Sequence, residues 1–152
     1  MRATGDDGVI GPRSTHLFHF RGLSLPRNQE TAPFMHEMGV AMQIVEIATA
    51  SIPAHLTGAR IETVNLKVGK LSAIVVDSLR FCFEAVTQDT ALEGARLRIT
   101  EIPVQAVCNA CRNQWTIEEP AFACPACRSG DITLLSGREL DIESIELAEE
   151  DH

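Results

Sequence analysis

Aromatic residues are scarce in this chain: Phe, Trp and Tyr together make up 5%, with a single Trp and no Tyr. This scarcity argues against a surface on which the bases of a nucleic acid would stack. Basic residues are also outnumbered, since 13 Lys and Arg stand against 21 Asp and Glu and give a formal net charge of −8. A chain with this balance repels phosphate backbones and anionic membranes, and its scattered arginines form no basic patch in the sequence.

Long apolar runs are absent as well. No stretch approaches the roughly 18 apolar residues of a membrane span, and residues 1–11 contain two aspartates but no apolar block of signal-peptide length. We therefore expect a cytoplasmic protein that does not bind membranes. In that reducing compartment, closely spaced cysteines are more often metal ligands than disulfides.

The remaining composition is that of a folded protein. Hydrophobic residues make up 45% and charged residues 22% of the 152 residues, enough for one ordinary domain or a small core with a metal-stabilised module. Residues 1–34 differ from the rest, because their glycines and prolines break every candidate period. We expect this segment to be disordered, or to lie upstream of a true start at Met35. His16 and His19 could bind a metal, although a flexible tail without a metal site is the favoured interpretation.

Two helices are predicted from the spacing of apolar residues. Between Met38 and Ile52 apolar residues recur every three or four positions, and Pro53 ends the run. The second helix has a cap at Asp77 or Ser78 and apolar residues at i, i+3, i+4 and i+7, namely Leu79, Cys82, Phe83 and Val86. Since Cys82 lies on this apolar stripe, we interpret it as a small core residue rather than a reactive thiol.

Three strands are predicted from the alternation of apolar and polar residues. They cover residues 64–69, 97–103 and 140–147, and the last shows a phase shift that a bulge near Ser144 would explain. These elements favour an α+β fold in which two helices cover a small three-stranded mixed sheet.

The domain organisation follows from an insertion between two of these strands. We expect residues 35–103 and 136–148 to form the α+β domain and residues 104–135 to form an inserted zinc-ribbon module. Residues 149–152 would be an acidic tail.

Four of the five cysteines form two closely spaced pairs, Cys108-x-x-Cys111 and Cys124-x-x-Cys127. Each pair lets two thiolates converge from one tight turn, and two such turns complete a tetrahedron of ligands. Four sulfurs leave no open position, so we expect a structural zinc site; an iron–sulfur cluster or a redox pair are the alternatives. Metal binding would contribute on the order of 10–16 kcal/mol to a module with little core of its own. Such modules serve many purposes, so the cysteines alone define no function.

Several short motifs accompany these cysteine pairs in a fixed order. They are Met35-His36-Glu37-Met38, Val68-Gly69-Lys70-Leu71-Ser72, Leu79-x-Phe81-x-Phe83, Glu93-Gly94-Ala95 and Gly137-Arg138-Glu139-Leu140. Each motif alone is unspecific, but their combination resembles the HypA/HybF family of hydrogenase maturation factors over about residues 35–148.

The resemblance implies a nickel metallochaperone rather than an enzyme. Members of the family hold structural Zn(II), carry Ni(II) at a Met-His-Glu motif and pass it, with the GTPase HypB, to the large subunit of [NiFe]-hydrogenase. In some organisms they also assist urease. The resemblance leaves open whether this chain forms a homodimer, and it implies no nucleic-acid partner.

The nickel ligands implied by the resemblance lie at residues 35–37. Ni(II) favours nitrogen and oxygen donors in a square-planar or tetragonal set. The imidazole of His36 would be one donor, and the backbone nitrogens of Met35 and Glu37 are the favoured further donors. Some members add a carboxylate from the loop before the second helix, but here Asp77 is only a nearby candidate, and we do not assign it.

The 34 residues before Met35 depart from the family pattern. If they are present, Met35 has no free amine, and the chelate loses a donor. Nickel would then bind more weakly through His36 and other groups, or else the native protein begins at Met35, which is the explanation we favour.

Two other functions compete with the nickel carrier. A zinc-ribbon adaptor for nucleic acid or a transcription protein could use Arg112, Arg128 and Trp115 around the cysteine pairs, but the acidic balance and the single Trp argue against it. A thiol oxidoreductase would need an unliganded pair with a lowered thiolate pKa.

Overall fold

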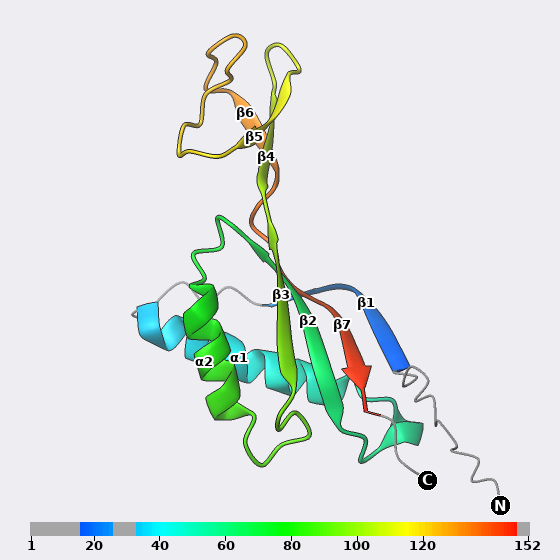
Figure 1. Cartoon of the computed structure of the whole chain (residues 1–152). Coiled ribbons are helices and arrows are strands. Elements are labelled where there is room, and N and C mark those ends of the chain that lie inside the picture. Colours follow the sequence, from blue (N-terminus) through cyan, green and yellow to red (C-terminus); the bar gives the residue numbers. More distant parts are fainter. Residues whose placement is uncertain (1–15, 26–32, 149–152) are drawn as a thin grey trace, which may run out of the picture.

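The computed structural model describes residues 16–25 and 33–148, which form an α+β domain and a smaller β-ribbon that projects from one end of it (Figure 1). The elements in chain order are β1 (His16–Ser24), α1 (Pro33–Ala50), the short 3₁₀ helix η1 (Ala54–Leu56), β2 (Ile61–Gly69), α2 (Val76–Val86), β3 (Arg96–Ile102), β4 (Val104–Cys108), β5 (Gln114–Ile117), β6 (Ile132–Ser136) and β7 (Leu140–Leu147).

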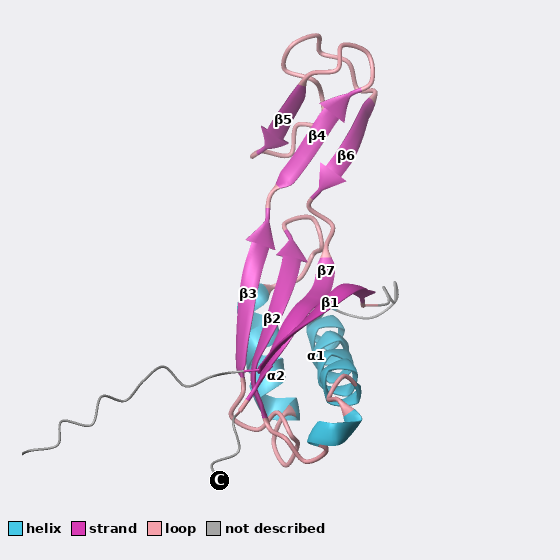
Figure 2. Cartoon of the chain, turned by 90° about the vertical axis from the view of Figure 1, so that its right-hand side faces the viewer, coloured by secondary structure: helices cyan, strands magenta, loops and turns pink. Residues whose placement is uncertain are grey.

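The larger sheet has the strand order β1-β7-β2-β3, and both helices lie on one of its faces (Figures 1 and 2). Strands β2 and β3 are parallel and are joined through α2, whereas β7 runs antiparallel to β2. A parallel pair needs a crossover of this kind, while antiparallel neighbours do not. The α+β class predicted from the sequence is therefore confirmed.

The first helix begins five residues before the expected position, at Pro33, whose fixed φ suits the first helical residue. Its buried stripe also differs from the simplest sequence reading. Ala41, Ile44 and Ala48 have no exposed surface, but Met42 is 59% exposed. The apolar residues of this helix are so dense that several stripes fit a period of 3.6, and only packing against the sheet selects one of them.

The second helix buries Leu79, Cys82 and Phe83, as the apolar spacing predicted. The expected cap at Asp77 or Ser78 is wrong, because both residues lie inside the first turn and Val75 is the cap residue. Val75 has no polar side chain that could accept a hydrogen bond from the N–H groups at the start of the helix. Partners for the N–H groups at this end must therefore come from elsewhere.

The bulge predicted in the last strand is confirmed. Asn65 of β2 pairs with Ser144, and the next residue, Leu66, pairs with Ile142, so that Glu143 is the extra residue of β7. The bulge keeps Ile142 and Ile145 on the helix-covered side, where both are buried, despite the phase shift in the sequence.

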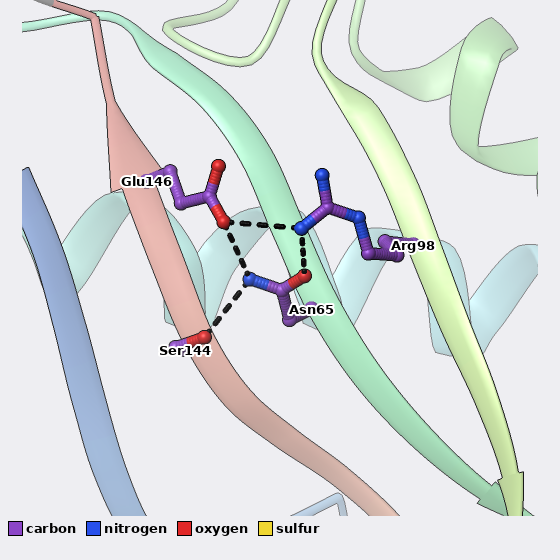
Figure 3. Close-up of polar contacts among 4 residues, drawn as sticks. All are labelled: Asn65, Arg98, Ser144 and Glu146. Atoms are coloured by element: carbon purple, nitrogen blue, oxygen red, sulfur yellow. Dashed lines mark hydrogen bonds and ion pairs between the residues drawn. The ribbon is translucent and has the colours of Figure 1, made fainter. Parts of the chain in front are cut away.

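The face of the sheet that carries no helix holds a polar network (Figure 3). The side-chain amide of Asn65 donates to Oγ of Ser144 (2.9 Å) and to Oε1 of Glu146 (3.2 Å). Arg98 donates from Nη1 to Oδ1 of Asn65 and to the same Glu146 oxygen, both at 3.2 Å. These bonds tie β3, β2 and β7 together on the open face.

The fourth strand of this sheet is a correction to the three-stranded prediction. Residues His16–Ser24, in the segment expected to be disordered, form β1 and pair antiparallel with β7. The physical reason is a short apolar pattern: Phe18 packs against the main core, and Leu25, directly after the strand, is only 3% exposed. The last two residues of the segment, 33–34, begin α1, and residues 1–15 and 26–32 lie outside the described part of the chain.

The β-ribbon has the strand order β5-β4-β6 and joins the larger domain where three chain segments meet. Gly69 donates its N–H to the carbonyl of Glu139 (2.7 Å), and Leu71 donates to that of Gly137 (2.7 Å). A Cβ atom on Gly69 would overlap the backbone of Gly137, and Gly137 itself has φ +111°. Both glycines are therefore required by the close approach of the two connecting segments to the end of β2.

Candidate metal centres

The four paired cysteines come from two similar turns at the far end of the ribbon. Cys108 is the last residue of β4, and Cys111 follows in the turn toward β5. Cys124 and Cys127 lie in the connection between β5 and β6. Cys108 and Cys124 are buried, and Cys111 and Cys127 are exposed.

The four sulfur atoms lie within 4.8 Å of one another. The Sγ atoms of Cys108 and Cys127 are 3.6 Å apart, as are those of Cys111 and Cys124. These separations are far beyond a disulfide bond of about 2.05 Å. They are close to the edge of about 3.8 Å expected for a tetrahedron with metal–sulfur bonds of about 2.3 Å.

Each turn is built by the same backbone hydrogen bonds. In the first turn, Arg112 donates its N–H to the carbonyl of Cys108 at 2.9 Å. In the second, Arg128 donates to the carbonyl of Cys124 at 2.8 Å. Both arginines have positive φ, 65° and 62°, an uncommon conformation for residues with a side chain. The repeated geometry positions two thiols per turn and directs both pairs toward one point.

The backbone of each turn also favours negative charge on the first cysteine of its pair. The N–H of Cys111 lowers the pKa of Cys108. Burial raises the pKa of Cys124, but the N–H groups of Cys127 and Ala126 outweigh it and lower this pKa to about 6. Although the N–H of Asn113 favours the Cys111 thiolate, hydrogen bonds to neighbouring thiols, first that of Cys124, raise its pKa to about 12.

This donor set suits a metal ion such as zinc. Four thiols in a tetrahedron offer a soft, closed coordination sphere, and a dication would replace the protons that they share in its absence. With four protein ligands there is no position left for a substrate, so the arrangement can stabilise the ribbon but offers no open coordination site for catalysis.

The Met-His-Glu motif lies in the first two turns of α1. His36 is half-buried, and the nitrogen of Met35 is a peptide amide within the helix. In an α-helix successive N–H groups point along the axis toward earlier carbonyls. The nitrogens of residues 35–37 therefore do not converge on one point in this conformation.

The side chain of Glu37 has a structural role that the sequence did not predict. It is only 2% exposed, and its Oε1 accepts a hydrogen bond from the N–H of Val75 at 3.1 Å. A carboxylate from α1 thus caps the start of α2, where negative charge is favourable. A sequence signal existed, since Glu37 falls on the buried stripe of α1, four residues before Ala41 and seven before Ile44.

Within the described residues, no group of potential metal-binding side chains is found around His36. The four cysteines are the one group of three or more His, Cys, Asp and Glu side chains in that part of the chain found close enough to hold a metal ion. Asp77 is exposed in the first turn of α2, and His16 and His19 are exposed on β1. A metal at His36 would thus need donors other than a preformed cluster of side chains.

An α+β domain with an inserted four-cysteine ribbon defines a class of small metal-binding proteins, and comparison with known proteins identifies the family. Residues 35–147 match the family model described as "Hydrogenase/urease nickel incorporation, metallochaperone, hypA". The chain belongs to the HypA family of hydrogenase maturation factors, as its motifs indicated. This is a family of metallochaperones and not of catalytic enzymes.

Similar proteins carry the name hydrogenase maturation factor HypA. The hydrogenase maturation factor HypA of Desulfosudis oleivorans is 56% identical over 115 residues, which are 76% of this chain and 100% of that protein. HypA of Desulfatibacillum aliphaticivorans is 52% identical over 115 residues, 76% of this chain and 88% of that protein. The solution structure of the Ni metallochaperone HypA from Helicobacter pylori has a TM-score of 0.53 at 22% identity, covering 75% of this chain and 98% of that one, so it supports the fold alone.

The helices of the described residues are all too short or too polar to cross a membrane.

Proposed function

We propose that this chain is a nickel metallochaperone that carries Ni(II) to the large subunit of [NiFe]-hydrogenase, and in a second role to urease, with a separate structural zinc site. The observation that carries the proposal is the family match, which starts at Met35 and therefore includes the complete Met-His-Glu motif. Its family description names nickel incorporation for both enzymes. The GTPase HypB is the proposed partner in delivery.

The two metals would be held by separate parts of the chain. Cys108, Cys111, Cys124 and Cys127 would bind zinc through four thiolates. Nickel, as the cargo, would bind at His36 with the backbone nitrogens of Met35 and Glu37. The side chain of Glu37 accepts a hydrogen bond from the N–H of Val75, which supports nickel ligation by the backbone of Glu37 rather than by its carboxylate.

The helical start of α1 sets a condition on nickel binding. Neighbouring backbone nitrogens can chelate one metal only when they lie side by side, so the turn around residues 35–37 would have to open. In a chain beginning at Met35 this turn is the frayed end of the helix, and its amine is available near neutral pH. In the longer chain the same nitrogen is an amide, so we expect weaker binding there.

The test is a calorimetric titration of the zinc-loaded protein with Ni(II), using the full chain and a chain that begins at Met35. We expect tight one-to-one binding in the shorter chain and weaker binding in the full chain. Failure of both chains to bind nickel would contradict the proposal and favour the adaptor function instead.

The substitution His36→Ala should abolish nickel binding in the shorter chain without loss of zinc. His55→Ala is the matched control, because His55 is exposed in η1 and lies outside the motif. Its nickel affinity should equal that of the parent. A loss of fold in the His36 variant would contradict the separation of the two sites.

A further inference from the structure

The outer strands of the larger sheet are β3 and β1. At the β3 edge, Arg80 of α2 donates from Nη1 to the carbonyl of Leu97 at 2.8 Å, so a side chain occupies one backbone acceptor. The opposite outer strand is β1, which covers the backbone groups of β7 that would otherwise form this edge. An uncovered strand edge is a template for pairing with another chain, so the way in which it is covered has consequences for association.

The pairing of β1 with β7 runs along almost all of β7. Its register extends from His16 opposite Leu147 to Ser24 opposite Asp141, with one irregularity between His19 and Leu23. Beyond the strand, Leu25 donates its N–H to the carbonyl of Leu140 at 3.1 Å. The family match covers residues 35–147, so this strand lies outside the matched part of the chain.

The two faces of β1 are unequal. Phe18 lies opposite the fully buried Ile145 and packs against the main core, and Leu25 belongs to the same core. Leu17 lies opposite Glu146 and is 48% exposed. The edge of β7 thus selects an extended segment with apolar residues at alternate positions, because only those side chains reach the core.

Charge adds a second criterion. Strand β7 carries Asp141, Glu143 and Glu146 and no basic residue. Strand β1 carries Arg21 and two histidines and no acidic residue. Two β7 strands placed edge to edge would bring acidic residues together, which is unfavourable for directly opposed pairs.

We propose that the outer edge of β7 is a strand-docking surface which His16–Ser24 occupies in cis. Its partner in trans is an extended segment that is free of acidic residues and apolar at alternate positions. The segment before Met35 therefore competes with any such partner, and the edge becomes available only when β1 leaves. This inference does not depend on nickel binding.

The experiment uses the full chain with residues 26–32 replaced by a protease recognition sequence of the same length. After cleavage, native mass spectrometry should find the fragment that contains β1 bound one-to-one to the remainder. A labelled peptide of residues 14–26, added in excess, should displace the fragment and yield a dissociation constant. Release of the fragment immediately on cleavage, with no binding of the peptide, would overturn the proposal.

Two peptide variants with the same substitution on opposite faces provide the matched control. Phe18→Ser should weaken binding by about tenfold or more, since it removes a side chain that packs on the core. Leu17→Ser should change the affinity by less than about threefold, as expected for an exposed position. Equal effects of the two would contradict the assigned faces.

The charge criterion has its own peptide, with Leu17→Glu and Ser24→Glu, which places acidic residues directly opposite Glu146 and Asp141. We expect its affinity to fall by about tenfold or more, and unchanged affinity would overturn this part of the proposal. Hydrogen exchange of the uncleaved chain gives an independent measurement. Those amides of β1 that are directed at β7 should be protected, with protection lost selectively on Phe18→Ser in the chain. Fast exchange of all β1 amides in the parent would also overturn the docking.

Discussion

The α+β domain and the ribbon of this protein are stabilised in different ways. The domain has a large core to which both helices and all four strands contribute, whereas the buried apolar cluster of the ribbon contains only Val104, Ala106 and Ile117. Trp115, Ile132 and Leu134 pack around that cluster but remain half-exposed. A module with so little buried surface needs another source of stability, and the four cysteine thiols lie together at its far end. Apolar burial therefore accounts for the stability of the domain, and we expect metal binding to supply that of the ribbon.

The largest effect is expected from changes that unfold the ribbon alone. Removal of zinc by a chelator, or Cys108→Ala, should unfold residues 104–136, because metal binding contributes on the order of 10–16 kcal/mol to such modules. The single tryptophan, Trp115, lies in β5 of the ribbon, so its fluorescence emission should shift to longer wavelength while the helical circular dichroism persists. Cys82→Ala is the control, because Cys82 lies in the other core and its loss should leave zinc content unchanged. Simultaneous loss of the helical signal on chelation would contradict the division.

The converse change weakens the domain alone. Ile44→Ala removes a fully buried side chain of α1 and should lower the free energy of unfolding by about 2–5 kcal/mol. Denaturant unfolding followed by circular dichroism measures this loss, and the zinc content of the folded protein should stay the same. Met42→Ala, on the exposed face of the same helix, should change the free energy of unfolding by no more than about 0.5 kcal/mol, since Met42 is 59% exposed.

A smaller effect is expected at the contact between the helices. Glu37→Ala removes the acceptor of the Val75 N–H and should cost about 1–3 kcal/mol, while Glu37→Gln should cost less because its amide oxygen can still accept. The same denaturant transition measures both variants. Equal costs for the two would indicate that the negative charge of Glu37, which both variants remove, stabilises this contact more than its hydrogen bond or its packing.

The smallest effect is expected on the open face of the sheet. Nζ of Lys67 and Oε1 of Glu143 are 3.0 Å apart, but both side chains are about 40% exposed. Lys67→Met should therefore change the free energy of unfolding by less than about 1 kcal/mol, and less still in high salt. A loss comparable to that of Ile44→Ala would show that the domain depends on surface charge and not on its core alone.

Local patterns in the sequence predicted the elements whose signal is complete within a few residues. The phase shift around Ser144 predicted the bulge because side chains must return to the buried face, whatever the partner strand is. The spacing of the cysteines predicted that four thiols would meet, because two tight turns suffice for this. Their assignment to zinc, and that of His36 to nickel, stay predictions.

The features that sequence patterns missed depend on distant partners. Strand β1 contains polar residues and Gly22, and its strand partner, β7, lies more than a hundred residues further along the chain. Nothing near His16–Ser24 indicates that the edge of β7 is available. The burial of Glu37 was missed for a similar reason, since its partner is a backbone amide 38 residues away and glutamate is rarely buried.

The ribbon leaves and re-enters the domain at two neighbouring points, so its deletion would leave only a short gap in the chain. The two connecting segments approach so closely that Oγ of Ser136 donates to the carbonyl of Pro103 at 2.8 Å. A short turn could therefore rejoin β3 to β7 without stretching either strand, and the entropy of closing so short a loop would be small. Such a shortening would remove all four cysteines of the candidate metal site and leave the strands of the larger sheet in place.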